Sequence, residues 1–409
     1  KYGQKLRELI LENEFKEYIY HSEKAFETAV VLSCTTIVKK GKPAEDNKII
    51  FNNKFEIPQN KLNEGFWSFE DPKILDLREK IENQSIQLKD IDNLDIYSGI
   101  KTGLNQAFII DLETKNRLIQ QDLKNEKIIR PLLRGIDIQR WKIDYHDLYL
   151  ILSKSGMELE SEYPSVWDYL KNYEEKLKKR TDQGVFWYNL RDCAYYDEFD
   201  REKIIWTEMT PHPSFLIDNG KYLLLNTSYM MIINNNNYNL KYINALLNSN
   251  LLFWVFQKIS PKLYGKRLRF IRQYVEKLPI YPASIEEQQS FIENVDRILK
   301  MNFELQKEID GFKHWIKKEF GIDKLSKKLE KYYELSEDEF IDEMRKKKVD
   351  TKSRKNREYL EREFNESLNI INPLLQEIKE TDDEIDRMVY DLYGLTDEEI
   401  QIIEDSLQN

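Results

Sequence analysis

The spacing of apolar and polar residues in the first 42 positions predicts a helix followed by two strands. Residues 4–14 carry leucine and isoleucine at helical spacing with charged residues between them, as in an amphipathic helix. Residues 29–38 read AVVLSCTTIV, and this apolar, β-branched run predicts a strand covered on both faces. Two strands and a helix cannot bury a core of their own. We therefore expect them to pack against later residues, or to be the end of a larger domain.

Strand and helix patterns alternate between residues 95 and 285. Short apolar runs predict strands at 203–206, 214–218 and 222–233. Apolar residues at helical spacing predict helices from Pro164 to Leu177 and from about Leu240 to Phe256, and the polar run NNNN at 234–237 predicts a loop. The expected fold class of this part is therefore mixed α/β (α+β).

Long helical patterns fill the chain after residue 285. Residues 286–314 and 359–379 carry apolar residues every three or four positions among Glu and Lys, which predicts two long helices lying side by side. Pro373 is expected to kink or to begin a helix. Residues 381–390, then Gly394, then Thr396 to Glu399 predict a helix, its C-cap and a second, capped helix.

These patterns divide the chain into four segments. Residues 43–94 are polar and asparagine-rich except for an aromatic island at 66–69, so we expect a connector there. The other three segments are residues 1–42, the mixed α/β domain of residues 95–285, and an all-α region of residues 286–409.

The composition of the chain bears on its cellular location and on its metal content. No apolar run reaches the roughly 18 residues of a membrane span, so no membrane partner is expected. Cys34 and Cys193 lie far apart in the sequence, which favours a reducing, cytoplasmic location over a disulfide framework. The four histidines and two cysteines show no zinc-ligand spacing, and no metal site is expected.

Charge is distributed unevenly along the chain. The formal net charge is −10, yet residues 258–277 hold seven basic residues against one acid. The acids gather at the end of the chain, where residues 380–409 hold eleven acids and a single base, Arg387. Because nucleic-acid binding depends on local basic patches, the negative total does not exclude it.

The segment YSGIKTGLNQAFII at 97–110 is the first candidate contact surface. Gly99 and Gly103 enclose a turn in which Lys101, Thr102 and Asn105 can each donate a hydrogen bond. The alternative is a hairpin turn with a solvated lysine.

Two further segments carry candidate DNA contacts. In the basic run KISPKLYGKRLRFIRQY we expect phosphate contacts from the charged residues, with an aromatic surface beside them: Lys258, Lys262, Tyr264, Lys266, Arg267, Arg269 and Arg272. Arg134 and Arg140 flank a turn at Gly135 and are weaker candidates. The alternatives are a solvated basic loop for the first segment and a structural turn for the second.

Several motifs in order resemble one family. They are YSGIKTGLNQAFII, PLLRGIDIQRW at 131–141, DREKIIW at 200–206, YINALLNSNL at 242–251 and the final EIDRMVYDLYGLTDEEI at 384–400. Together they resemble the target-recognition domain of type IIG restriction–modification enzymes and of adenine-specific DNA methyltransferases with a TaqI-like specificity domain. In that family, residues 1–42 look like the last helix and strands of the methyltransferase fold.

The resemblance implies sequence-specific recognition of double-stranded DNA for a restriction–modification system. The catalytic Asn-Pro-Pro-Tyr motif and a glycine-rich cofactor turn are both missing from this sequence, and no nuclease motif can be assembled. The chain alone is therefore expected to have no catalytic residues and no cofactor. S-adenosylmethionine and Mg²⁺ are implied only for the full-length parent, whose methyltransferase and nuclease domains would be the other partners.

Two alternatives belong to different functional classes. One is a separate DNA specificity subunit like those of type I systems, although such subunits usually carry two recognition domains and one is visible here. The other is a non-catalytic protein-interaction scaffold in which the basic loop is incidental.

Overall fold

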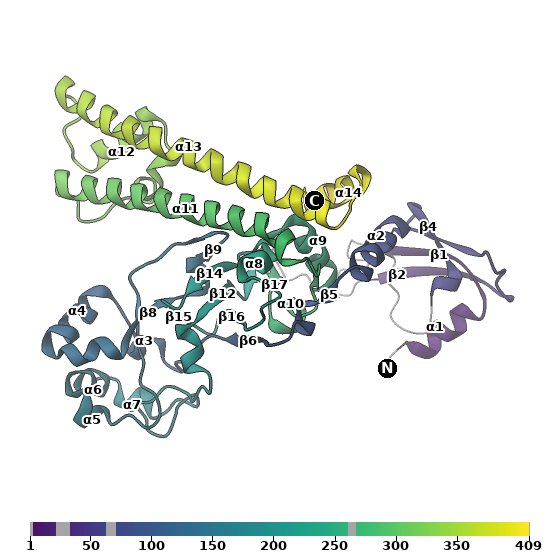
Figure 1. The fold of residues 1–409 in the computed structure, drawn as a ribbon, viewed down its shortest axis with the longest axis horizontal. Helices are drawn as coiled ribbons and strands as arrows, with labels where there is room; N and C mark the ends of the chain where they lie inside the picture. The colour runs from purple at the N-terminus through teal and green to yellow at the C-terminus, as the bar shows by residue number, and fades with distance from the viewer. Residues whose placement is uncertain (1–2, 22–32, 63–70, 261–266, 409) are drawn as a thin grey trace. The chain divides into compact units, whose positions relative to one another are not determined.

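The chain folds into two units, Lys1–Gln84 and Ser85–Asn409. A computed structural model describes residues 3–21, 33–62, 71–260 and 267–408, and its helices and strands are drawn in Figure 1. No helix among these residues is long and apolar enough to cross a membrane.

The first unit is a four-stranded sheet with two helices. Its elements are α1 (Gln4–Leu11), β1 (Glu14–His21), β2 (Ser33–Lys39), β3 (Lys48–Phe51), β4 (Phe55–Pro58) and α2 (Pro72–Asn83). The strand order is β2-β1-β3-β4, with β1 and β3 parallel and the outer pairs antiparallel. Phe15, Ile10 and Ile49 form its small core.

Two expectations for this unit differ from the structure. The strand predicted at 29–38 is seen from Ser33 onward as β2, but six of its seven residues are exposed, so it is not covered on both faces within this unit. Residues 43–94, expected to be a connector, contain the β3–β4 hairpin and α2. The hairpin joins the sheet because β3 pairs with β1, a long-range contact that residue composition does not encode. The aromatic island at 66–69 lies outside the described residues.

Two four-stranded sheets form the centre of the second unit. One is antiparallel with the order β14-β12-β16-β6, and the other has the order β15-β8-β11-β7. Their strands are β6 (Leu94–Ser98), β7 (Ile109–Ile110), β8 (Ile129–Leu133), β11 (Tyr149–Ile151), β12 (Glu202–Thr207), β14 (Leu216–Asn219), β15 (Leu223–Leu224) and β16 (Ser228–Ile233). Three short pairs surround them: β5 (Ile86–Gln87) with β18 (Pro279–Ile280), β9 (Ile138–Gln139) with β10 (Lys142–Ile143), and β13 (Met209–Thr210) with β17 (Leu268–Arg269).

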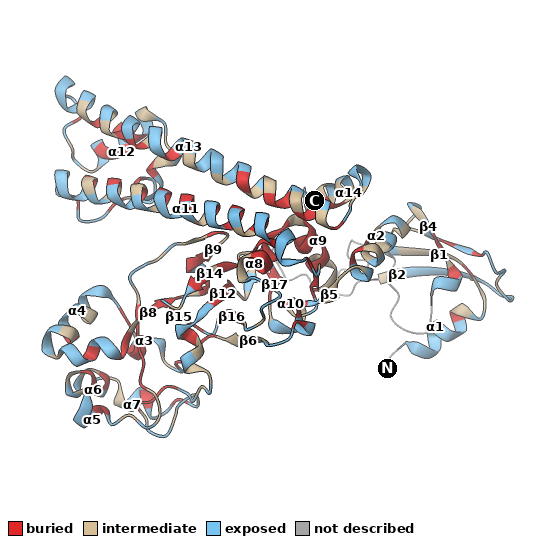
Figure 2. Cartoon of the chain, viewed as in Figure 1, coloured by how far each residue is buried: buried red, intermediate tan, exposed pale blue. Residues whose placement is uncertain are grey.

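Short helices cover these sheets. They are α3 (Asn105–Phe108), α4 (Leu112–Gln121), α5 (Leu159–Glu162), α6 (Pro164–Lys171), α7 (Glu174–Leu177), α8 (Leu240–Asn248), α9 (Asn250–Ile259) and α10 (Arg272–Val275). Figure 2 shows buried residues concentrated on the strands and on α8 and α9. The mixed α/β fold predicted for this region is confirmed.

The helix predicted over residues 240–256 is in fact two helices. Ser249 adopts an extended backbone, with φ −66° and ψ 151°, and its hydroxyl accepts a hydrogen bond from the amide of Leu252. A serine in this position caps the new helix rather than continuing the old one. The predicted helix from Pro164 to Leu177 is likewise divided, into α6 and α7.

A helical arm, residues 285–408, completes the second unit. It consists of α11 (Ile285–Phe320), α12 (Glu337–Lys346), α13 (Arg354–Leu392) and α14 (Asp397–Gln408), and α11 lies alongside α13 (Figure 1). The predicted pair of long helices and the C-cap at Gly394 are confirmed, since Gly394 has φ +58°. Pro373 does not begin a helix but lies inside α13.

Candidate nucleic-acid interface

Several loops of the second unit meet along one side of its sheets, and we call this surface the loop edge. It comprises residues 99–102, 134–137 and 226–227 together with the β13–β17 strand pair. The amide of Ile100 donates to the carbonyl of Leu224 at 2.7 Å, and the amide of Asn226 donates back to the carbonyl of Ile100 at 3.1 Å. The amide of Glu208 in turn donates to the carbonyl of Thr227 at 2.9 Å, which brings the start of β13 to the same place.

Two glycines of the sequence motifs are required by this convergence. A Cβ at Gly99 would lie 2.0 Å from the carbonyl oxygen of Leu225, and a Cβ at Gly135 would lie 2.5 Å from Oγ1 of Thr207. Both positions therefore accept only glycine without movement of the neighbouring chain. The glycines of YSGIKTG and PLLRGIDIQRW thus hold separate segments of sequence together at the loop edge.

The loop edge exposes side chains of mixed character. Asn226 and Thr227 are exposed, and Ile136 keeps 75% of its surface accessible. Arg267 and Arg269 are exposed while Leu268 between them is buried, as the alternation of a strand requires. The edge therefore offers amide, hydroxyl, methyl and guanidinium groups side by side.

The first predicted contact turn is rigidly held. Thr102 is buried and its hydroxyl donates to Oδ1 of Asn105 at 2.5 Å, while Lys101 is exposed and lies 3.6 Å from Asp182. Asn105 is exposed at the start of α3. The turn is not a hairpin, because β6 before it pairs with β16 and the chain after it enters α3.

A buried arginine fixes that turn from below. Arg180 donates to the carbonyl of Thr102 at 2.5 Å and to the carbonyl of Trp187 at 2.7 Å, and its guanidinium lies over the ring of Phe108. Burial lowers the pKa of Arg180 to about 10, so it still carries its charge at neutral pH. Nothing in the sequence around Arg180 distinguishes it from the exposed lysines beside it, and it was not among the candidates.

Arg134 is paired within its own turn. Its Nε and Nη2 donate to the two carboxylate oxygens of Asp137 at 3.1 and 2.8 Å, and this bonding raises the pKa of Arg134. The Asp137 side chain is buried. A bidentate pair of this kind shapes the turn that presents Ile136.

The predicted basic segment is only partly within the described residues. Lys262, Tyr264 and Lys266 lie outside them. Lys258 lies on α9 with its ammonium 5.6 Å from the ring centre of Trp254. Arg269 donates through Nε to Glu208 at 2.8 Å, which raises the pKa of Arg269. Arg272 bonds Glu276 at 3.1 Å and the carbonyl of Ile96 at 3.3 Å.

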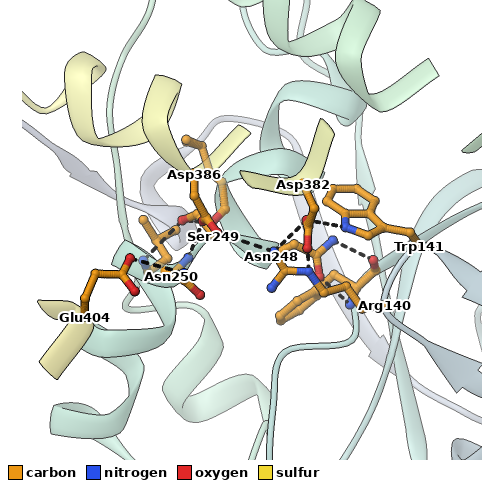
Figure 3. Close-up of polar contacts among 11 residues, drawn as sticks. Arg140, Trp141, Asn248, Ser249, Asn250, Asp382, Asp386 and Glu404 are labelled. Carbon is orange, nitrogen blue, oxygen red and sulfur yellow. Dashed lines mark hydrogen bonds and ion pairs between the residues drawn. The ribbon is translucent and has the colours of Figure 1, made fainter. Parts of the chain in front are cut away.

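Arg140 lies against the helical arm, where it faces Asp382 of α13 (Figure 3). Its Nε and Nη2 donate to Oδ1 of Asp382 on α13 at 3.1 and 2.7 Å. The indole of Trp141 donates to the same oxygen at 2.7 Å. The structure thus places five of the predicted residues in or beside the loop edge: Lys101, Thr102, Arg134, Arg267 and Arg269. Arg140 instead pairs with Asp382 of the arm.

Sequence reasoning missed the exposed residues between the strands. Asn226, Thr227 and Ile136 carry no charge cluster or motif of their own, and only the pairing of distant segments places them together. The glycines at 99 and 135 were the available signal, since they mark where chains approach closely.

Comparison with known proteins gives two family matches. Residues 130–280 match the family described as "TaqI-like C-terminal specificity domain". Residues 284–389 match a family described as "Domain of unknown function (DUF8810)".

One curated relative and two solved structures illustrate the likeness. The type II methyltransferase M.BstVI of Geobacillus stearothermophilus is 22% identical over 317 residues, covering 68% of this chain and 55% of the relative. The type IIL restriction-modification enzyme MmeI, solved in complex with DNA, is 13% identical with a TM-score of 0.46, covering 98% of this chain and 46% of that chain. The type IIG restriction endonuclease BpuSI is also 13% identical with a TM-score of 0.36, covering 72% and 40%.

The chain spans about half the length of the proteins that it matches. The loop edge draws most of its residues from the matched segment, including Ile136, Asn226, Thr227 and Arg269. The resemblance inferred from the motifs is confirmed for the recognition segment: residues 130–280 match the family of TaqI-like C-terminal specificity domains.

Proposed function

We propose that the second unit binds double-stranded DNA through the loop edge and recognises a base sequence for a restriction–modification system. The observation that carries this proposal is that five separated segments meet at the loop edge, four of them within the specificity-domain match of residues 130–280. The match to a type II methyltransferase along 68% of the chain supports the same function.

The loop edge offers some groups that suit contacts with the DNA phosphates and others that suit contacts with the bases. Arg267 and Arg269 provide exposed cations for phosphates, which give affinity without sequence information. Asn226 provides an amide that can pair with the edge of adenine, and Ile136 provides an apolar surface for a thymine methyl group. Lys101 adds an exposed cation, 3.6 Å from Asp182, directly after the residue that bonds Asn226.

The catalytic steps belong to a longer parent protein in this proposal. That parent would methylate adenine with S-adenosylmethionine, and would cleave DNA with Mg²⁺ in a separate domain. The present chain contributes no catalytic residue and binds no cofactor. Residues 1–42 would be the end of the methyltransferase fold, and the arm would support the recognition domain.

The test is a direct binding measurement with a matched control. The chain is titrated into a labelled duplex of random sequence at several salt concentrations, beside the variants R267A/R269A and K300A/K307A. Each double variant removes two positive charges, but Lys300 and Lys307 are exposed on α11 of the arm, away from the loop edge. Loss of two phosphate contacts should lower the slope of log affinity against log salt by about 2 in R267A/R269A only.

Selection from a random duplex pool then tests sequence recognition. Enrichment of one sequence by the wild type, and its loss in N226A, is expected. Failure of the wild-type chain to bind duplex DNA, or equal slopes in the two double variants, would refute the proposal and favour an interaction scaffold.

A further inference from the structure

The tip of the β9–β10 hairpin is seated on the helical arm. Trp141 at this tip is 3% exposed and has φ +63°, an unusual backbone angle for a bulky residue. Asp382 accepts three hydrogen bonds on a single oxygen, two from Arg140 and one from the Trp141 indole (Figure 3). The strained tip and its charged partner together fix the hairpin to α13.

One turn further along α13, a second carboxylate holds the beginning of α9. Oδ1 of Asp386 accepts the backbone amide of Asn250 at 2.7 Å, and Oδ2 lies 3.8 Å from Nη2 of Arg140. Asn250 is the first residue of α9, where amides lack partners inside the helix. The Asn250 side chain reaches Glu404 of α14 at 3.4 Å. The arm therefore sets the position of the N-terminus of α9.

The other end of α9 is packed against the strand that carries Arg269. The rings of Phe256 on α9 and Phe270 stack with centroids 4.0 Å apart. The carbonyl of Phe270 accepts the indole of Trp206 at 2.7 Å, and its amide donates to the carbonyl of Glu208 at 2.7 Å. Phe270 directly follows Arg269. A continuous series of contacts thus runs from α13, through α9, to a cation of the loop edge.

We propose that Asp382 and Asp386 are positioning residues for DNA binding, which fix α9 and thereby the placement of Arg269. This inference rests on the proposed function. It assigns to the arm an effect on DNA affinity although these two carboxylates contact no residue of the loop edge.

The arm does not depend on these carboxylates to stay attached. α11 packs against α8, where the rings of Tyr242 and Phe291 meet at 5.4 Å. Gln288 of α11 also bonds the backbone of Asn237 and Asn239 at 2.7 and 2.8 Å. Loss of Asp386 should therefore relax α9 while the arm remains docked.

The direction of the change in DNA affinity distinguishes a positioning role of Asp386 from a direct effect of its charge on the DNA. Removing a negative charge from a DNA-binding protein should strengthen binding through the long-range field. At a pH above about 8, where the Asp386 carboxyl is ionised, D386A should instead weaken binding by about tenfold, since the contact that it removes is a hydrogen bond to a charged group. D383A is the matched control, because Asp383 is an exposed acid on the same helix. D386N keeps an oxygen acceptor for the Asn250 amide and should bind like the wild type.

The experiment measures duplex affinity of the full chain for these variants and for D386A in an R269A background. Weakening by D386A, none by D383A, rescue by D386N and a much smaller effect when Arg269 is absent would support the inference. Equal or tighter binding by a folded D386A, or an undiminished effect in the R269A background, would overturn it. If D386A fails to fold, W141F and D382A take its place with the same expectations. A wild-type chain without DNA affinity would instead overturn the proposed function, and this inference with it.

Discussion

The pH dependence of stability should reveal the burial of Asp386. Its side chain is packed among α13, α14 and the start of α9, and burial raises its pKa from the ordinary 3.8 to about 7. Arg140 from the hairpin tip and the hydrogen bond from the Asn250 amide oppose this rise, whereas the nearby carboxylates of Asp382 and Glu404 add to it. Desolvation outweighs the ion pair because Arg140 lies closer to Asp382 than to Asp386.

Proton linkage determines whether the unfolding free energy rises or falls with pH. The folded chain holds the Asp386 proton more tightly than the unfolded chain does. The stabilisation is therefore complete below the unfolded pKa of 3.8 and is lost as the pH rises through about 7. A shift of about three pH units corresponds to an upper limit of about 4 kcal/mol.

The assay is urea unfolding of the wild type and of D386N at a series of pH values, monitored by a spectroscopic signal that reports the unfolding of the second unit. Asn cannot ionise, so the difference in unfolding free energy between the two proteins should change by a few kcal/mol between pH 4 and pH 8, in favour of the variant at high pH. A difference that stays constant over this range would show that Asp386 is not buried as described, and would refute the reasoning.

Two further predictions concern a close backbone approach and a buried ion pair. G99A places a Cβ 2.0 Å from the carbonyl oxygen of Leu225 and should lower the unfolding free energy by about 1–3 kcal/mol. G311A lies in open space on α11 and should raise the unfolding free energy by about 0.5–1 kcal/mol in the same thermal unfolding experiment. Equal effects of the two variants would contradict the close approach at the loop edge. K203M removes the fully buried partner of Asp218, 2.5 Å away, and should cost about 3–5 kcal/mol by leaving that carboxylate unpaired. The double variant K203M/D218L should cost clearly less, and an equal cost would argue against the buried ion pair.

Periodicity predicted the elements whose stability is local. The arm helices α11 and α13 repeat apolar residues over many turns, and the strand at 202–207 has the apolar centre Ile204-Ile205-Trp206, so both were visible in the sequence. The break at Ser249 was not, because a serine is compatible with a helix and becomes a cap only when its backbone is extended.

The pattern of residues along the sequence could not predict which charged residues pair across long sequence distances. Arg140 follows a glycine turn and looked like a DNA contact, whereas its partner Asp382 is 242 positions away in a different helix. The charge count of residues 258–277 identified a basic surface but not which of its cations are paired: Arg269 with Glu208 and Arg272 with Glu276. The position of a charge in the sequence does not reveal its neighbours, and only the fold does.

The pairing of β16 with β6 has a consequence for transplanting specificity between proteins. Residues 130–280 look self-contained by family match, yet β6 pairs with β16 from Leu94↔Ile233 to Ser98↔Tyr229, and β5 pairs with β18 at Ile86↔Ile280. A fragment that begins at residue 130 would lack β6 and would leave the backbone hydrogen-bonding groups along one edge of the apolar strand β16 unpaired, which favours aggregation. The smallest exchangeable module that keeps both pairings therefore begins near residue 85, well upstream of the segment that matches the family.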